Sequence, residues 1–293
     1  MRGLGRGGRF PGHPGGRAGN DRPGHHGRRG AARGRRRRSM NNSDDGALGL
    51  AGKVAVVTGG SRGLGAAIAR KLCACGCDVL LNYANDDDAA ARLVAELDES
   101  KGTAFAVKGD IRRADGLAGV LDAVRGRHGR VDVFVHNVAT WQPMSAVGAV
   151  AEDLHADIAT AVDPLIRAAG PLAGLMPAGG RIIAVSSNGA RSVIPRYVSL
   201  GLAKAALEAL VRYLAVELAD RGIAVNAVST AKIDKGPGSG DPGMLAALAA
   251  RTPAGRLTRP TDIADVVALL CTAEAAWIHG QVITADGGLS LRA

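Results

Sequence analysis

The chain has few aromatic residues, few cysteines and no long apolar run, and each scarcity excludes a class of protein. Its 293 residues include 3 Phe, 2 Trp and 3 Tyr, whereas Gly reaches 42. This composition favours close-packed helices and sheet over an all-β sandwich, which depends on aromatic and β-branched packing. No stretch of about 18 apolar residues is present to span a bilayer. With 46% hydrophobic residues, the chain can still bury a large core.

The four cysteines do not form a recognisable metal or redox pattern. Cys73, Cys75 and Cys77 alternate, and Cys271 is far away in sequence. This spacing matches neither a C-x-x-C redox pair nor a zinc knuckle. We therefore expect buried thiols at a helix end, and no metal.

The positive charge of the chain is confined to its first residues. The net charge is +10, but residues 1–40 contain twelve Arg and one acid, which leaves the rest of the chain at −1. Residues 1–40 are rich in Gly, Arg, Pro and His, so we expect a disordered Arg/Gly-rich tail. The tail lacks the apolar run of a secretory signal and the amphipathic, Ser-containing helix of a transit peptide, so we expect a cytoplasmic protein without a membrane segment.

Two interpretations of the tail stay open. Its Gly-Arg repeats could bind nucleic-acid phosphates by charge, with a steep dependence on salt. Alternatively, translation starts at Met40, and the preceding residues are translated upstream sequence. The abrupt change in composition near Met40 favours the second interpretation.

From Leu50 onward, apolar strands alternate with amphipathic helices, which predicts one domain over residues 50–293. The expected strands cover 53–58, 78–83, 104–108, 131–136, 181–186, 224–228 and 281–285. The expected helices cover 66–75, 87–100, 114–128, 153–175, 197–221 and 260–271. Several strands are continuous apolar runs, which is typical of strands buried on both faces. We predict an α/β fold with a single Rossmann-like, doubly wound parallel sheet of seven strands and helices on both faces.

A glycine-rich turn follows the first expected strand. The sequence TGGSRGLG at 58–65 opens a helix, and Gly59, Gly63 and Gly65 would allow a tight turn close to a pyrophosphate. The phosphate charge would then meet the N-terminus of the helix. This position in a doubly wound pattern predicts a dinucleotide site.

The choice between NADPH and NADH depends on the end of the second strand. An acid there would bind the ribose hydroxyls of NAD, but this chain has no acid until Asp86. Arg62 could meet a 2′-phosphate, which favours NADPH over NADH. Two interpretations of the run at 86–88 stay open, because it could repel a phosphate or cap a helix facing solvent.

A second set of reactive side chains follows the fifth expected strand. Tyr197 and Lys204 are seven residues apart, about two turns along a helix, which places them on nearly the same face. A lysine near a tyrosine would lower the phenol pKa and could hold a nicotinamide ribose.

These motifs together resemble the short-chain dehydrogenase/reductase family over residues 50–290. The matching elements are TGGSRGLG at 58–65, Gly-Asp-Ile at 109–111, His-Asn-Val-Ala at 136–139 and the Ser/Tyr/Lys set at 186–204. More narrowly, residues 194–229 are similar to enoyl-acyl carrier protein reductases. RTPAGRL at 251–257 and GQVITADGG at 280–288 are similar to the NADPH-dependent type III members.

The resemblance implies roles for individual residues. Tyr197, Lys204 and Ser187 would be catalytic, Ser187 by orienting the substrate or by hydrogen bonding Tyr197. The cofactor-binding set would be Gly59, Ser61, Arg62, Gly63, Leu64, Gly65, Asp110, Ile111, Asn137, Ala139, Lys204 and Ile233. No metal is implied.

The Tyr-Lys spacing separates two reactions within the family. Members that reduce ketones have Tyr-x-x-x-Lys, whereas this chain has six residues between Tyr197 and Lys204, as the enoyl reductases do. An enoyl thioester accepts hydride at the β-carbon, so its tyrosine must reach an enolate oxygen farther from the nicotinamide.

The chain departs from the family pattern at two places. Ala159, with Asp157 nearby, stands where ketone-reducing members have an Asn, and enoyl reductases generally lack that Asn. Residues 229–235 replace the usual nicotinamide loop, and we expect the following residues 236–243 to form a mobile substrate lid. Trp141 and Gln142 are expected to line the pocket.

The sequence thus predicts an NADPH-dependent enoyl-thioester reductase acting on an acyl carrier protein or CoA substrate, in fatty-acid, polyketide or other secondary metabolism. A ketoreductase acting on a β-ketoacyl carbonyl and a non-catalytic NADP-binding regulator stay as alternatives. The family resemblance also implies a homo-oligomer, a dimer or tetramer formed through the Tyr197 helix and the C-terminal segment.

Overall fold

The computed structural model describes residues 47–236, 238 and 240–292. The Arg/Gly-rich tail expected over residues 1–40 lies outside these residues. The sheet has seven parallel strands in the order β3-β2-β1-β4-β5-β6-β7. They are β1 (Val54–Val57), β2 (Asp78–Tyr83), β3 (Ala104–Lys108), β4 (Val133–His136), β5 (Arg181–Ser187), β6 (Ala224–Thr230) and β7 (Val282–Thr284). The predicted seven-stranded doubly wound sheet is confirmed.

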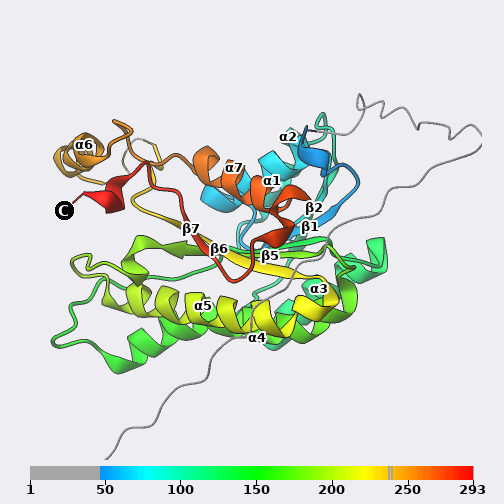
Figure 1. The fold of residues 1–293 in the computed structure, drawn as a ribbon, viewed down its shortest axis with the longest axis horizontal. Helices are drawn as coiled ribbons and strands as arrows, with labels where there is room; N and C mark the ends of the chain where they lie inside the picture. The colour runs from blue at the N-terminus through cyan, green and yellow to red at the C-terminus, as the bar shows by residue number, and fades with distance from the viewer. Residues whose placement is uncertain (1–46, 237, 239, 293) are drawn as a thin grey trace, which may run out of the picture. The chain divides into compact units, whose positions relative to one another are not determined.

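Helices cover both faces of the sheet (Figure 1). The first layer contains α1 (Gly63–Ala74), α2 (Asp87–Glu96) and α7 (Pro260–Leu270), and the second contains α3 (Ala114–His128), α4 (Ala151–Leu175) and α5 (Val198–Glu217). Each layer encloses its own apolar core, because alternate side chains of a strand point to opposite faces. On β4, for example, Val133 and Val135 face α1 and α7, whereas Phe134 faces α4 and α5.

One helix was not predicted. α6 (Pro242–Arg251) includes residues 242 and 243, which were expected to belong to a lid loop. Asp241 begins this helix by accepting a hydrogen bond from the Met244 N–H at 2.7 Å, and Pro242 occupies the first turn. Figure 1 shows α6 at one end of the sheet, near the C-terminal segment. The Ala254 N–H, just after α6, donates to the Gly287 carbonyl at 3.1 Å, which joins the two segments.

All four cysteines are buried, unpaired thiols within the core of the α1 and α7 layer. Cys73 is near the end of α1, Cys75 and Cys77 follow, and Cys271 ends α7. Burial raises the pKa of Cys271 to about 12 and raises that of Cys77 as well. The prediction of buried thiols is confirmed, and we find no candidate metal cluster in the described part of the chain. Among the described helices, none is both long and apolar enough to cross a membrane.

Candidate active site

The expected site residues follow the carboxyl ends of five strands. The glycine turn follows β1, Asp110 follows β3, Asn137 follows β4, Tyr197 follows β5, and Ile233 follows β6. All strands are parallel, so these ends lie on one edge of the sheet. The strand order reverses between β1 and β4, where ligands bind in doubly wound sheets.

The glycines of the turn after β1 are required by its backbone. Gly59 and Gly63 have φ values of 61° and 56°, in the left-handed region that favours glycine. A Cβ on Gly65 would lie 2.1 Å from the Gly59 carbonyl oxygen, so the first turn of α1 can approach the loop only because Gly65 has no side chain. Gly60, which was not among the predicted cofactor residues, is also constrained, because a Cβ there would lie 2.8 Å from the Leu81 Cβ.

Asn137 fastens the end of β4 to this turn. Its backbone N–H donates to Thr58 Oγ1 at 2.9 Å, and its Nδ2 donates to the Thr58 carbonyl at 3.2 Å. The predicted cofactor residue Asn137 therefore shapes the glycine turn. Ala139, two residues on, is exposed at the same edge of the sheet.

The acidic run at 86–88 is a helix cap. Asp86 accepts a hydrogen bond from the Ala89 N–H at 2.9 Å and begins α2, while Asp87 pairs with Lys108 at 2.7 Å and accepts from the Tyr83 hydroxyl at 2.7 Å. The Lys108 ammonium holds the pKa of Asp87 below its usual value. The charge of Asp87 is thus locally compensated.

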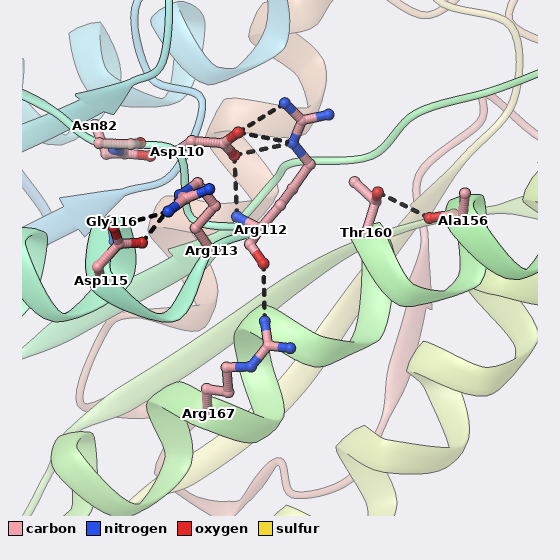
Figure 2. A network of polar contacts seen from close by, with 10 residues as sticks. Asn82, Asp110, Arg112, Arg113, Asp115, Gly116, Ala156, Thr160 and Arg167 are labelled. Carbon is pink, nitrogen blue, oxygen red and sulfur yellow. Dashed lines mark hydrogen bonds and ion pairs between the residues drawn. The ribbon is translucent and has the colours of Figure 1, made fainter.

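Asp110 follows β3, and its carboxylate is oriented by Arg112 (Figure 2). Arg112 donates to it through the backbone N–H at 3.1 Å and through the guanidinium at 2.7 Å. This ion pair lowers the pKa of Asp110. The Arg112 carbonyl accepts from Arg167 of α4 at 2.9 Å, so the segment after β3 is joined to the α4 layer. The neighbouring Ile111 is buried.

Tyr197 and Ser187 lie within hydrogen-bond distance of each other. The Ser187 Oγ is 3.2 Å from the Tyr197 hydroxyl. A Cβ on Gly189 would lie 2.5 Å from the tyrosine ring, so this glycine leaves room for it. Tyr197 precedes α5 as its N-cap, whereas we predicted that the helix would include it.

The expected lowering of the Tyr197 pKa by Lys204 is not found. Burial raises the pKa of Tyr197, and the hydrogen bond between Tyr197 and Ser187 opposes this only in part. The Lys204 ammonium donates to the Val185 carbonyl of β5 at 2.7 Å. Burial also lowers the pKa of Lys204 to about 8. The two side chains lie at the same strand end, but each has its own hydrogen-bond partner.

Buried polar groups behind the site were not identified as functional residues from the sequence. Glu208 of α5, 4% exposed, accepts from Ser186 at 2.7 Å and from Arg191 at 3.0 Å, which fixes the segment between β5 and α5. His136 of β4 is fully buried, with its Nε2 2.8 Å from the Ala161 carbonyl. Burial, assisted by the charge of Lys204, lowers the pKa of His136 to about 4, so it is neutral at pH 7. Only the position of Glu208 one turn after Lys204 could have indicated its role.

Ile233 follows β6 and forms an isolated bridge with Thr258. The next residue, Asp234, donates its backbone N–H to the Thr258 carbonyl at 2.8 Å. This segment is therefore attached to the residues before α7. Of the expected lid, positions 237 and 239 lie outside the described residues.

Comparisons with known proteins agree with this architecture. A family model described as enoyl-(acyl carrier protein) reductase matches residues 59–290. The chain is 38% identical over 245 residues to a 1-cyclohexenylcarbonyl-CoA reductase of Streptomyces collinus, covering 82% of this chain and 87% of the relative. It is 31% identical over 254 residues to the NADH-dependent enoyl-[acyl-carrier-protein] reductase FabI of Nostoc sp., covering 83% and 98%.

Among solved structures, the chain is similar to the promiscuous reductase LugOII, which catalyses keto-reduction at C1 during lugdunomycin biosynthesis. The TM-score is 0.77 at 32% identity, over 82% of this chain and 98% of that one. Relatives thus include both enoyl reductases and a ketoreductase. The chain belongs to the short-chain dehydrogenase/reductase family of oxidoreductases, within the group that the enoyl-(acyl carrier protein) reductase model describes.

Proposed function

We propose that this protein reduces the carbon–carbon double bond of an enoyl thioester with NADPH. The observation that carries the proposal is the arrangement after β5. The Tyr197 hydroxyl is hydrogen bonded to Ser187, while the ammonium of Lys204, seven residues further on, donates a hydrogen bond to the β5 backbone. Six residues separate Tyr197 from Lys204, the spacing of the enoyl reductases, whereas ketone-reducing members of the family have three. The relationship to the 1-cyclohexenylcarbonyl-CoA reductase supports the thioester assignment.

The glycine turn and its surroundings fit a nicotinamide dinucleotide. The positive φ values of Gly59 and Gly63 and the missing Cβ of Gly65 bring backbone N–H groups to the α1 N-terminus, which suits a pyrophosphate. Ser61, Arg62 and Leu64 complete this turn. Asp110, Ile111 and Ala139 would contact the cofactor from neighbouring strand ends, and Ile233 would contact it beyond β6. When bound, the nicotinamide supplies the hydride.

The side chains after β5 would control the proton at the substrate carbonyl. The raised pKa of Tyr197 keeps the phenol protonated at neutral pH, so it can donate a hydrogen bond to the thioester oxygen. As charge develops on that oxygen, this bond strengthens and stabilises the enolate. Ser187 orients the phenol, and the Lys204 ammonium, fixed at Val185, has further N–H groups for the ribose.

Arginines beside the glycine turn support NADPH over NADH. A cavity of about 330 Å³ between α1 and α2 is lined by Arg62, Arg70 and Arg92. Arg70 pairs with Glu96 at 2.6 Å, whereas no ion pair of Arg62 or Arg92 is found among the described residues. Two arginine charges therefore lie beside the turn, where a 2′-phosphate would need them.

Replacing Arg62 by Ala is expected to weaken NADPH binding about 10-fold, because one charge-assisted hydrogen bond is lost. NADH binding should stay the same, since NADH has no 2′-phosphate. Fluorescence titration of both nucleotides would measure this. Arg125→Ala, which removes an exposed arginine from α3, is the control. If the unaltered protein binds NADH more tightly than NADPH, the assignment is wrong.

The reaction itself can be tested with two thioesters. We would follow NADPH oxidation by the full chain with crotonyl-CoA and with acetoacetyl-CoA at matched concentrations. Turnover of crotonyl-CoA alone is expected. Turnover of acetoacetyl-CoA alone would instead favour a ketoreductase, the activity of LugOII. NADPH binding without turnover of either thioester or of the longer trans-2-octenoyl-CoA would also contradict the proposal and would favour a cofactor-binding regulator.

We further propose an acyl carrier protein or CoA as the carrier of the substrate, and a homo-oligomer, a dimer or tetramer. Exposed apolar side chains on α5 support self-association: Leu202, Tyr213 and Val216 are 47%, 70% and 79% exposed. Light scattering of the purified protein would show a monomer if this part of the proposal is wrong.

A further inference from the structure

The segment between β4 and α4 is fastened to two helices beside Tyr197. On one side, Asp157 of α4 accepts from the Thr140 hydroxyl at 2.6 Å and from the Gln142 N–H at 2.9 Å. On the other side, Ser199 of α5 donates to the Gln142 carbonyl at 3.1 Å. We call residues 140–144 the substrate-side loop. Its conformation is fixed at Gln142 from both helices.

The loop also holds the backbone immediately before Tyr197. The Met144 N–H donates to the Arg196 carbonyl at 3.1 Å, and Met144 forms an isolated bridge with Tyr197. Arg196 has a φ of 59°, an uncommon conformation for a residue with a side chain. Such a conformation persists where the surroundings hold it, and the bond from Met144 does so.

Trp141 lies in sequence between Thr140 and Gln142, the two residues that donate hydrogen bonds to Asp157. Its ring centroid is 5.7 Å from that of Tyr197, with the planes tilted by 47°. The side chain of Trp141 is 49% exposed, so part of the indole contacts Tyr197 and part is open to solvent. Fixing Thr140 and Gln142 therefore fixes the large aromatic surface beside the phenol.

The side chain of Asp157 is buried, although burial of a carboxylate is energetically unfavourable. It is 1% exposed, and its carboxylate has no cationic partner among the described residues. A buried carboxylate costs several kcal/mol unless hydrogen bonds compensate it. Both compensating bonds come from the substrate-side loop, so displacing the loop would leave the carboxylate without them. The Asp157 carboxylate thus opposes movement of the loop.

We infer that Asp157 is a positioning residue that holds Trp141 against Tyr197, and that Trp141 is a specificity residue for the acyl group. The inference deepens the proposed function and rests on it for the substrate class. When the thioester oxygen meets the Tyr197 hydroxyl, the carbons beyond the double bond lie only a few bonds away. The exposed part of the indole offers them an apolar contact surface. The preferred substrates would therefore have an apolar acyl group longer than four carbons.

Tryptophan fluorescence tests the positioning step without any need for turnover. The chain has two tryptophans, and Trp277 is 96% exposed, so Trp277→Phe leaves Trp141 as the sole emitter. In this background, Asp157→Asn keeps the side-chain shape but replaces one acceptor oxygen by an amide. We expect acrylamide to quench Trp141 at least about 2-fold more efficiently, because the ring loses its fixed place. Asp153→Asn on the same helix is the control. Equal quenching in both variants would overturn the inference.

A double-mutant cycle separates positioning from general loss of stability. Thr140→Val removes one bond but leaves the carboxylate and its bond to Gln142. If Asp157 acts through the loop, the quenching effects of Thr140→Val and Asp157→Asn are expected to be non-additive. Additive effects of the two substitutions on quenching would contradict a positioning role. So would changes in quenching that only parallel the changes in the midpoint of urea unfolding.

Specificity is tested by comparing trans-2-octenoyl-CoA with crotonyl-CoA. Trp141→Ala is expected to lower the ratio of their kcat/KM values about 10-fold, as expected for the loss of contact with roughly two methylenes. The change should appear mainly in KM for octenoyl-CoA. An unchanged ratio would overturn the role of Trp141. Failure of the proposed function would be distinguishable from this outcome, because the unaltered protein would then turn over neither enoyl thioester.

Discussion

Tyr197→Phe is expected to lower kcat by about 10²- to 10⁴-fold, the range over which a positioned proton donor contributes. The variant keeps the ring that packs over Gly189 and removes only the hydroxyl that bonds Ser187. The affinity for NADPH should therefore stay within error. Steady-state kinetics with crotonyl-CoA and a fluorescence titration of NADPH would measure the two quantities.

The helix α5, which follows Tyr197, offers a matched control. Tyr213 lies on α5 and is 70% exposed, and its hydroxyl makes no hydrogen bond within the described part of the chain, so Tyr213→Phe should leave kcat unchanged. If Tyr197→Phe retains more than about a tenth of the activity, the phenol does not stabilise the transition state as proposed.

Lys204→Met is expected to abolish turnover and at the same time to stabilise the fold. Burial lowers the pKa of Lys204 from 10.5 to about 8, so at pH 7 the folded state carries a charge that it disfavours. That shift means that the buried charge destabilises the folded state by roughly 3 kcal/mol, which the substitution would remove. The variant would lose about 1 kcal/mol of this gain, because the Val185 carbonyl would no longer accept a hydrogen bond. Urea unfolding at pH 7 should show a gain of about 2 kcal/mol in the free energy of unfolding.

The pH dependence of the free energy of unfolding is an independent test of whether the buried charge of Lys204 destabilises the fold. Because the pKa of Lys204 is lower in the folded state, the unfolded chain binds more protons between about pH 8 and pH 10.5. The contribution of Lys204 to stability therefore rises with pH across that window, and the advantage of Lys204→Met should shrink there. An advantage that is constant from pH 7 to pH 10 would show that the buried charge is not its cause.

Much of the fold was predictable from local sequence. The bounds of β2, β3 and α3 agree with the predicted ranges, because apolar runs and helical periodicity report burial directly. The helix α6 was missed because the glycine- and proline-rich residues before it suggested a loop. The Asp241-Pro242 pair was the available signal, as a helix cap followed by a proline in the first turn.

The candidate site was predictable in its residue types but not in its contacts. The sequence spacing placed Tyr197 and Lys204 near one strand end. It could not show that Lys204 donates a hydrogen bond to Val185 or that burial raises the Tyr197 pKa. The bonds of Glu208 to Arg191 and of Asp157 to Thr140 and Gln142 join segments from different elements. Such pairs arise only when helices pack on the sheet, and a single sequence does not encode them in any local pattern.

The four buried thiols make one layer of this protein chemically observable. They all lie in the core beneath α1 and α7, so an alkylating reagent can reach them only when that layer opens. The labelling rate of the native protein therefore measures how often the helix behind the glycine turn separates from the sheet. The α4 and α5 core contains none of the four cysteines, so its opening would leave the thiols unlabelled.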